Sequence, residues 1–282
     1  MLYRTALFLG FIIVRMLPGF GQAQPYHFLV LTDTQLGMHA ADKNFAQEAA
    51  SYEFAVASIN RLKPEFVVVL GDLVNKAGDM EQTREFLRIS RTIDPFIPVY
   101  YVAGNHDVGP APNPETLAAY RKNVGLDYYS FHAGPVYGIV LNSNLIIEPK
   151  NAMAESEQQD SWIRKELETA KASGAPHIMV FQHHPYFLKD SQEPAQWGNI
   201  PLDRRQSMLE LLYRYGVRYI FAGHVHQNSA GKYRELEAVA TGPIAMPFGD
   251  EGSGIRAVAV TGSDVQHRYY EFGRMPNKLA DK

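Results

Sequence analysis

Short apolar runs alternate with longer amphipathic segments along residues 27–226. The apolar runs have the length of buried strands, and each ends in glycine or polar residues, at 27–33, 64–72, 96–107, 177–185 and 217–226. Other segments place their apolar residues on one helical face, at 44–63, 81–93, 116–123, 155–174 and 203–216. This alternation predicts βαβ units and a largely parallel central region.

Two further regions have the pattern of strands joined by turns. Residues 128–143 contain two apolar runs on either side of Gly134-Pro135, which predicts a hairpin. From residue 235 onward the pattern suggests a second sheet, with strands but no helices at 236–241, 254–260 and 264–272. The expected fold class is α/β, a two-sheet β-sandwich flanked by helices. No linker or repeat divides it, so we expect residues 24–282 to form a single domain.

Residues 1–23 have the pattern of a secretory signal peptide. Arg4 precedes the apolar run ALFLGFIIV, and Gly21 and Ala23 are small residues at the expected cleavage positions. Arg15 and Pro18 interrupt the segment and make a membrane span unfavourable, although an uncleaved N-terminal anchor is the alternative. We therefore expect an exported protein, periplasmic or secreted, with no stable membrane span after cleavage.

The composition is that of a folded protein, with 46% hydrophobic and 20% charged residues. Cleavage after Ala23 would change the formal net charge from −3 to −5, so no surface for nucleic acid is evident. The chain has no cysteine, which excludes thiol chemistry, disulfide bonds and a lipid anchor on cysteine.

Polar residues follow five of the predicted strands. Because the carboxyl ends of parallel strands meet at one edge of a sheet, we expect these side chains to converge. A lone histidine is more often a packed residue, but Asp, Asn and His together are harder to explain by packing. The residues are Asp33 with Gln35, Asp72 with Asn75, Asn105 with His106 and Asp107, His183 with His184, and His224 with His226.

This mixture of carboxylate, amide and imidazole groups suits a pair of divalent cations, such as Mn, Fe, Zn or Mg. Asp72 is the candidate bridging ligand, because Gly71 lets the backbone approach closely. Two cations about 3.5–4 Å apart can clamp the attacking and leaving oxygens of a phosphoryl displacement. A bridging water would then become the hydroxide nucleophile.

The motifs TDTQ, GDLVN, GNHD, QHHP and GHVH, in this order, resemble the calcineurin-like metallophosphoesterase superfamily. The resemblance extends from Phe28 to Tyr270 and implies a four-layer αββα fold. A closer likeness is to the calcineurin-like phosphoesterase domain-containing protein 1 family, also called complete S-transactivated protein 1. It rests on DTQLG, EQTREFLR, YYSFHAGPVYGIVLNS, FQHHPYFL, GHVHQNSAGKY and HRYY.

The resemblance implies ligands for each of two divalent metal ions. One ion would be held by Asp33, Asp72 and His226, and the other by Asp72, Asn105, His183 and His224.

The resemblance also implies catalytic roles for the histidine and aspartate of GNHD. His106 would contact the phosphate or protonate the leaving oxygen, and Asp107 would orient His106 and fix its tautomer. His184 would lie behind the ligand His183.

Two positions differ from related patterns. Gln35 stands where the first motif of the superfamily usually has histidine, which makes Gln35 an uncertain ligand. Because an amide oxygen binds transition metals less well than imidazole, we expect a weaker first site or one that favours Mg or Mn. Gln35 also resembles the closer family, so an active enzyme is still expected. Asn75 stands where purple acid phosphatases have a tyrosine ligand to iron, so a purple enzyme is not expected.

Residues beside the motifs have two interpretations each. Aromatic and amide side chains near the loops either line a substrate cleft or close the core. Two adjacent arginines either bind phosphate or are solvated at the start of a helix. The residues are Tyr186, Phe187, Trp197 and Asn228 in the first group and Arg204 and Arg205 in the second.

The sequence predicts a metallophosphatase that hydrolyses phosphate monoesters of a phosphoprotein or small molecule by attack of a metal-bridging hydroxide. One alternative is a phosphodiesterase that acts on nucleotide or glycerophosphodiester substrates. Another is a metal-retaining, non-catalytic binding protein. The intact His106 and Asp107 argue against this last alternative, since a binding protein needs no acid for a leaving group.

Overall fold

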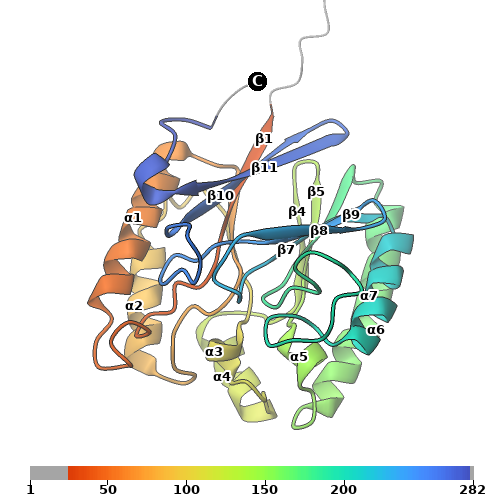
Figure 1. The fold of residues 1–282 in the computed structure, drawn as a ribbon, viewed down its shortest axis with the longest axis horizontal. Coiled ribbons are helices and arrows are strands. Elements are labelled where there is room, and N and C mark those ends of the chain that lie inside the picture. Colours follow the sequence, from red (N-terminus) through yellow and green to blue (C-terminus); the bar gives the residue numbers. More distant parts are fainter. Residues whose placement is uncertain (1–24, 280–282) are drawn as a thin grey trace, which may run out of the picture.

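The computed structural model describes residues 25–279. Two β-sheets pack face to face, and helices cover the outer face of each sheet, which gives four layers (Figure 1). The predicted α/β sandwich flanked by helices is therefore confirmed. The expected signal peptide, residues 1–23, lies outside the described residues.

The first sheet has five strands in the order β11–β10–β1–β2–β3. Strands β1, β2 and β3 are parallel, and β10 runs antiparallel to β1. The strands are β1 (Tyr26–Leu31), β2 (Phe66–Val69), β3 (Val99–Tyr101), β10 (Gly254–Thr261) and β11 (Asp264–Glu271).

The second sheet has six strands in the order β4–β5–β6–β7–β9–β8. Its four inner strands are parallel, and β4 and β8 run antiparallel at the two edges. The hairpin predicted at 128–143 is confirmed as β4 and β5. The strands are β4 (Tyr129–Ala133), β5 (Val136–Val140), β6 (His177–Phe181), β7 (Val217–Ala222), β8 (Ser229–Tyr233) and β9 (Leu236–Ala240).

Long helices cover the outer faces of the sheets. Helices α1 (Ala46–Leu62) and α2 (Met80–Ser90) pack on the first sheet, and α6 (Met153–Ala172) and α7 (Leu202–Arg214) pack on the second. Shorter helices lie in loops between other elements, and a 3₁₀ helix follows the last strand (Figure 1). They are α3 (Asn105–Val108), α4 (Pro114–Asn123), α5 (Asn144–Ile147) and the 3₁₀ helix η1 (Phe272–Arg274).

The strands after residue 235 do not form a sheet of their own, which corrects the sequence-based expectation. β9 pairs in parallel with β7 in the second sheet, whereas β10 and β11 lie beside β1 in the first. β10 thereby pairs the edge of β1 that β2 does not cover. Strand β8 could not be recognised from the sequence, because its SAGKY segment has few apolar residues.

Alternate residues of the central strands face opposite layers, as the period of a strand requires. In β1, Leu29 and Leu31 pack toward α1 and α2, whereas Phe28 and Val30 face the second sheet. All four side chains are fully buried. A strand buried on both faces reads as a continuous apolar run, which explains the sequence FLVL.

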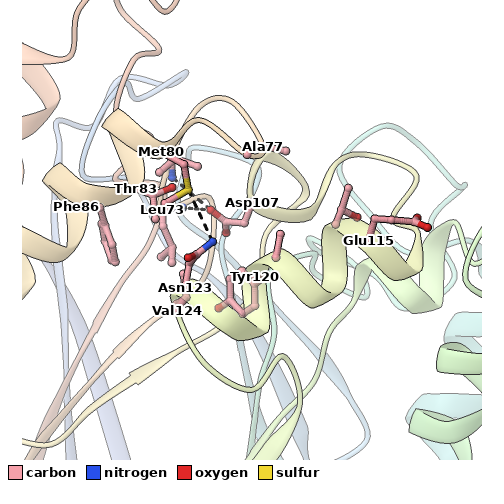
Figure 2. Close-up of a pocket in the computed structure, with 14 residues that line it drawn as sticks. Leu73, Ala77, Met80, Thr83, Phe86, Asp107, Glu115, Tyr120, Asn123 and Val124 are labelled. Atoms are coloured by element: carbon pink, nitrogen blue, oxygen red, sulfur yellow. Dashed lines mark hydrogen bonds between the residues drawn. The ribbon is translucent and has the colours of Figure 1, made fainter.

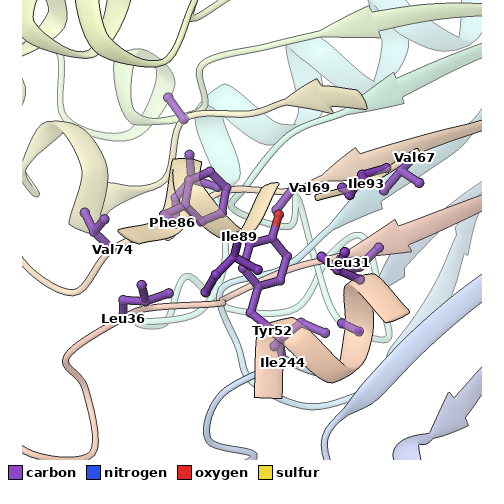
Figure 3. Packing of buried hydrophobic residues seen from close by; sticks show 14 of the residues in the cluster. Leu31, Leu36, Tyr52, Val67, Val69, Val74, Phe86, Ile89, Ile93 and Ile244 are labelled. Atoms are coloured by element: carbon purple, nitrogen blue, oxygen red, sulfur yellow. The ribbon is translucent and has the colours of Figure 1, made fainter. Parts of the chain in front are cut away.

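Figure 3 shows the core between the first sheet and its two long helices. Tyr52 of α1 stacks on Phe86 of α2 with ring centroids 5.1 Å apart and 3° between the planes. The Tyr52 hydroxyl also makes a 2.9 Å hydrogen bond with the hydroxyl of Ser90. This packing fixes α2, and so fixes one end of the loop that carries Asp72 and Asn75.

The loops after β1, β2, β3, β6 and β7 meet at one edge of the sandwich. The Nδ1 atom of His183, after β6, donates to the carbonyl of Leu70, after β2, at 2.8 Å. The predicted site residues therefore converge on an edge shared by two sheets, rather than on the edge of a single sheet. Among the described residues, we find no helix with the length and apolarity that a membrane crossing requires.

Candidate metal centre

The backbone is strained where the predicted site residues lie. Nine non-glycine residues among those described have a positive φ, and five of them are predicted site residues. A positive φ costs a non-glycine residue about 1–3 kcal/mol, and it persists where the surrounding structure imposes it, typically at functional sites. The five are Asp33, Gln35, Asp72, His224 and His226, with φ between 38° and 70°.

Gly71 and Gly104 let the loops after β2 and β3 approach each other. A Cβ atom at Gly71, where φ is 91°, would lie 2.7 Å from the amide nitrogen of Gly104 and 2.9 Å from Nδ1 of His183. A Cβ atom at Gly104 would lie 2.2 Å from Oδ1 of Asp72. A larger residue at Gly104 would displace Asp72, and one at Gly71 would displace Gly104 or His183, which confirms the close approach expected at Gly71.

Donor atoms from both sheets meet around the Nε2 atom of His183. This atom lies 3.1 Å from Oδ1 of Asn105, 3.2 Å from Oδ2 of Asp72 and 3.2 Å from Nδ1 of His224. Because the Nδ1 atom of His183 donates to the Leu70 carbonyl, its tautomer is fixed and Nε2 is left for a ligand. This set, which we call the second half-site, comprises Asp72, Asn105, His183 and His224.

A second set of donors lies beside it. The Nε2 atom of His226 is 3.5 Å from Oδ1 of Asp33, and its Nδ1 atom donates to the Met246 carbonyl at 2.5 Å. One ligand atom from each of Asp33, Asp72 and His183 lies within 4.8 Å of the others, so Asp72 connects the two sets. This set, which we call the first half-site, comprises Asp33, Gln35, Asp72 and His226.

The donors present fit a pair of divalent cations. Oδ1 of Asp33 and Oε1 of Gln35 are buried, and neither has a hydrogen-bond partner among the described residues. Such unpaired buried oxygens are costly unless they bind a cation. The structure brings together Asp33, Asp72, Asn105, His183, His224 and His226. Gln35 joins them through its backbone, whose amide donates to the Asp72 carbonyl at 2.8 Å. That each of these residues, Gln35 included, binds metal stays a prediction.

Burial and charge act in opposite directions on the titratable groups. Burial opposes ionisation of Asp72, but the charge and hydrogen bond of His183 outweigh it and lower the pKa of Asp72. Burial opposes protonation of His183, but the charges of Asp72 and Asp33 outweigh it and raise the pKa of His183 to about 9. Burial and the charge of His183 lower the pKa of His224 to about 4. Without bound cations, His183 is therefore protonated on both ring nitrogens at pH 7, and a cation must displace the proton on Nε2.

The structure corrects the expected contact between Asp107 and the ring of His106. The Nδ1 atom of His106 donates to the Asn75 carbonyl at 2.5 Å, so this carbonyl fixes the tautomer. The Asp107 carboxylate is occupied by backbone amides, because it accepts hydrogen bonds at 2.9, 3.3 and 2.8 Å from Leu73, Val74 and Gly104. Asp107 therefore anchors the loop after β2 to the start of α3.

A pocket of about 200 Å³ adjoins Asp107 between α2 and α4 (Figure 2). Met80, Phe86 and Val124 line it with apolar atoms, and Tyr120 contributes a buried hydroxyl that lacks a partner among the described residues. Burial and the charge of Asp72 raise the pKa of Asp107 to about 8. The anchoring role of Asp107 follows from the three backbone amides that its side chain accepts, not from this pKa.

Each half-site has an exposed aromatic side chain against one of its histidines. Trp197 is 70% exposed, and its ring centroid lies 4.6 Å from that of His224. Phe248 is 53% exposed and stacks on His226 with centroids 4.4 Å apart. Trp197 was a candidate from the sequence, whereas Phe248 was not, because its only signal is its place in a loop rich in glycine and proline.

Other residues that had two interpretations have structural partners. Tyr186 and Phe187 are buried in the core between the second sheet and its helices. The guanidinium group of Arg205 is buried and donates to the carbonyls of Ile200, Ser191 and Glu193. Arg204 pairs with Asp160, and Asn228 donates to Glu251 and accepts from Gly242.

His184 is a further candidate beside the second half-site. One ligand atom from each of His183, His184 and His224 lies within 4.8 Å of the others. The hydroxyl of Ser143 contacts both the Nδ1 atom and the amide nitrogen of His184 at 2.9 Å. Burial lowers the pKa of His184 well below its ordinary value, so this ring is neutral. The repeated histidine of QHHP is the sequence signal for this position.

Sequence comparison relates the chain to known phosphatases. The family model for calcineurin-like phosphoesterase matches residues 26–228. The chain is 35% identical over 269 residues to serine/threonine-protein phosphatase CPPED1 of Bos taurus. This alignment covers 90% of the chain and 86% of the relative.

Structural comparison finds the same fold in proteins of distant sequence. A dimetal phosphatase from Danio rerio has a TM-score of 0.63 at 14% identity, with 88% of this chain and 96% of the other covered. The purple acid phosphatase PPD1 from yellow lupin (Lupinus luteus) has a TM-score of 0.65 at 15% identity, with 92% and 53% covered. At these identities the likeness establishes the architecture of two sheets flanked by helices.

Proposed function

Because the chain belongs to the calcineurin-like phosphoesterase family, we propose that it hydrolyses phosphate monoesters with two divalent cations held by the two half-sites. One observation carries this proposal. Ligand atoms from loops of both sheets converge around Asp72 and His183. Oδ1 of Asp33, one of these atoms, is buried and has no hydrogen-bond partner within residues 25–279. Metal-dependent phosphoester hydrolysis agrees with this arrangement and with the phosphatases among the relatives.

The chain's own residues would position the reacting groups. When bound, a pair of divalent cations supplies an acidified water and neutralises charge on the phosphate. Oδ1 of Asp72 accepts the amide of His106 at 2.8 Å, while its Oδ2 faces Nε2 of His183 at 3.2 Å. The Asp72 carboxylate is therefore held in one orientation between the half-sites.

His106 is the proposed group for the phosphate or the leaving oxygen. Its Nδ1 atom is engaged with the Asn75 carbonyl, so Nε2 is the atom that can exchange a proton with a substrate. His106 also follows Asn105 directly on α3, which places it beside the second half-site. Asp107 supports this geometry from the backbone.

The proposed substrates are phosphate monoesters, either a phosphoprotein or a small molecule. The CPPED1 relative bears the name of a serine/threonine-protein phosphatase, which supports a phosphoprotein. The proposed export of the chain, which the pattern of residues 1–23 supports, makes a small-molecule ester equally suitable. The mass of the protein recovered from fractionated cells tests export, because cleavage after Ala23 removes a defined segment.

The test is hydrolysis of p-nitrophenyl phosphate by the metal-stripped protein before and after addition of Mn, Mg, Zn or Fe. We expect turnover to return with metal in the parent but not in Asp72→Asn. Turnover of bis(p-nitrophenyl) phosphate alone would replace the monoesterase by a diesterase. Stoichiometric metal binding without turnover of either ester would favour a non-catalytic binding protein.

A further inference from the structure

We propose that Asp42, acting through Asn75, orients the side-chain amide of Gln35 so that its oxygen faces the first half-site. This inference rests on the metal centre of the proposed function. Asp42 and Asn75 are positioning residues in this view, because each acts on the cation through Gln35.

Three side chains form a line from the surface to the site. Oδ1 of Asp42 accepts a hydrogen bond from Nδ2 of Asn75 at 2.8 Å. Oδ1 of Asn75 in turn accepts from Nε2 of Gln35 at 3.3 Å. Asp42 is exposed, whereas Gln35 is only 2% exposed and its Oε1 atom lacks a partner among the described residues. We call Asp42, Asn75 and Gln35 the amide relay.

The carboxylate sets the direction of the whole relay. An ionised carboxylate only accepts hydrogen bonds, so Asn75 must turn its NH₂ group toward Asp42. The oxygen of Asn75 then faces Gln35, which must donate through its own NH₂ group. The oxygen of Gln35 is therefore left for a cation. A reversed amide would present N–H protons, whose partial positive charge opposes cation binding.

Gln82 holds the carboxylate in place. Its Nε2 atom donates to the same Oδ1 atom of Asp42 at 2.8 Å. Its Oε1 atom accepts the backbone amides of Asn75 and Lys76, each at 3.0 Å. Because Gln82 is buried in the first turn of α2, it ties Asp42 to the loop that carries the middle of the relay.

The backbone around Asp42 is shaped for these contacts. A Cβ atom at Gly37 would lie 2.5 Å from Nε2 of Gln82 and 2.9 Å from Oδ1 of Asp42, so glycine leaves the space they occupy. Ala41 and Asp42 have φ of 47° and 63°, two consecutive left-handed residues. Such strain persists where the surroundings impose it, as they do here through the side chain of Asp42.

The amide relay fixes the orientation of the Gln35 amide, whereas a single hydrogen bond is enough to fix a ligand histidine. The Met246 carbonyl fixes the tautomer of His226 with one hydrogen bond. An amide can present oxygen or nitrogen by rotation of its terminal group, so Gln35 needs a partner of defined polarity. Asn75 has that polarity because Asp42 imposes it.

The test is a Mn²⁺ titration with a fluorescent reporter for each half-site in the full chain. Trp197 lies against His224 and reports the second half-site. Phe248→Trp, combined with Trp197→Phe, moves the reporter to His226 and the first half-site. Both reporter proteins carry Trp162→Phe, because Trp162 is the other tryptophan of the chain. We expect Asp42→Ala to weaken Mn²⁺ binding at the first half-site about tenfold, the lower end for groups that orient a ligand. The titration that Trp197 reports should not change.

The decisive comparison uses the Gln35→Ala background. Because Asp42 acts through Gln35, Asp42→Ala should cause no further loss of Mn²⁺ affinity there. An undiminished loss in that background would overturn the proposal, since it would reveal a direct effect of the carboxylate charge. Asp264→Ala, which removes an exposed carboxylate from the first residue of β11, is the matched control and should leave both titrations unchanged.

Asp42→Asn separates orientation from charge. Asparagine keeps an oxygen that can accept from Asn75 and Gln82, so affinity should stay closer to that of the parent than in Asp42→Ala. A loss as large as that of Asp42→Ala would contradict orientation by an acceptor. Thermal unfolding of the metal-free variants should match the parent. These titrations read cation binding alone, so a failed relay is distinguishable from a failed phosphatase assay.

Discussion

The two half-sites share Asp72 but hold their other donors in different ways. In the second half-site, Oδ1 of Asn105, Oδ2 of Asp72 and Nδ1 of His224 lie 3.1–3.2 Å from Nε2 of His183, so two imidazole nitrogens and two oxygens face one another. In the first, a single imidazole lies 3.5 Å from Asp33, and an amide takes the place of the second imidazole. Nitrogen-rich sites favour Zn and Fe, whereas oxygen-rich sites favour Mg and Mn. One centre can therefore hold two cations of different affinity.

The largest effect should come from the residue that both half-sites share. Asp72→Asn keeps the shape but removes the charge that balances two cations. We expect the rate of p-nitrophenyl phosphate hydrolysis to fall at least about a hundredfold, the scale for loss of one preorganised electrostatic group. Calorimetry with Mn²⁺ should show weaker binding at both half-sites. Loss at only one would break the view that Asp72 bridges them.

Protons should compete with the cation at the second half-site. Burial opposes protonation of His183, but Asp72 and Asp33 raise its pKa to about 9. Because a ligand nitrogen must be unprotonated, affinity should rise about tenfold per pH unit from pH 6 until it levels near the pKa. Calorimetry in buffers of different ionisation enthalpy should detect about one proton released at pH 7 for each cation that binds to the second half-site.

The stability of the metal-free chain should depend on pH in the opposite sense. Protonation of His183 stabilises the folded chain below the ordinary pKa of 6.5, and this contribution is lost as the pH rises through about 9. His183→Asn is the comparison variant, and it should remove both dependences. Proton release that persists in His183→Asn would assign the proton to another group.

Gln35→His should make the first half-site more like the second. Imidazole binds Zn²⁺ better than an amide oxygen does, so we expect Zn²⁺ affinity at the first half-site to rise about tenfold. The Phe248→Trp reporter and calorimetry measure this change. Unchanged affinity would show that the amide already serves as well as imidazole, and the proposed difference between the half-sites would fail.

The convergence of the second half-site on Asp72 could be predicted from the sequence, because its residues closely follow apolar strands. Asp72, Asn105 and His183 each lie within a few residues of a strand that reads as a continuous apolar run. Parallel strands bring their carboxyl ends together, so order along the chain was enough to group these side chains. The close approach of the backbone at Gly71 could be inferred as well, because a glycine stands directly before Asp72.

The supports of the site could not be predicted, because they depend on contacts between loops. Asp42 and Gln82 stand in ordinary polar segments, and only the fold brings them within 2.8 Å of each other. Asp107 was assigned to His106 because the two are adjacent, whereas the structure directs its carboxylate to backbone amides. Likewise, β10 and β11 read correctly as strands, but their sheet was set by pairing with β1, which a local pattern does not encode.

The smallest predicted effect concerns the loop that places Trp197 on the second half-site. Glu193 holds this loop by accepting the amides of Leu188 and Lys189 at 2.8 and 3.1 Å and the side chain of Asn199 at 2.7 Å. Burial opposes its ionisation, but these hydrogen bonds lower the pKa of Glu193 to about 2. Its stabilising contribution is thus present above the ordinary pKa of 4.5 and is lost as the pH falls toward 2.

Glu193→Gln should loosen this loop at neutral pH and weaken Mn²⁺ binding at the second half-site about threefold, as expected for partial loss of a hydrogen-bond network. Trp197 emission in the parent should change between pH 4.5 and 2 through both Glu193 and His224, whose pKa of about 4 lies in the same range. The comparison is therefore made at pH 7, where Glu193→Gln should already show an altered emission. The Phe248→Trp reporter should not respond, because the Phe248 amide is bonded to the His226 carbonyl and not to Glu193. Glu157→Gln, an exposed carboxylate on α6, is the control. An equal response of both reporters would show that the two half-sites are covered by one cooperative unit rather than by separate loops.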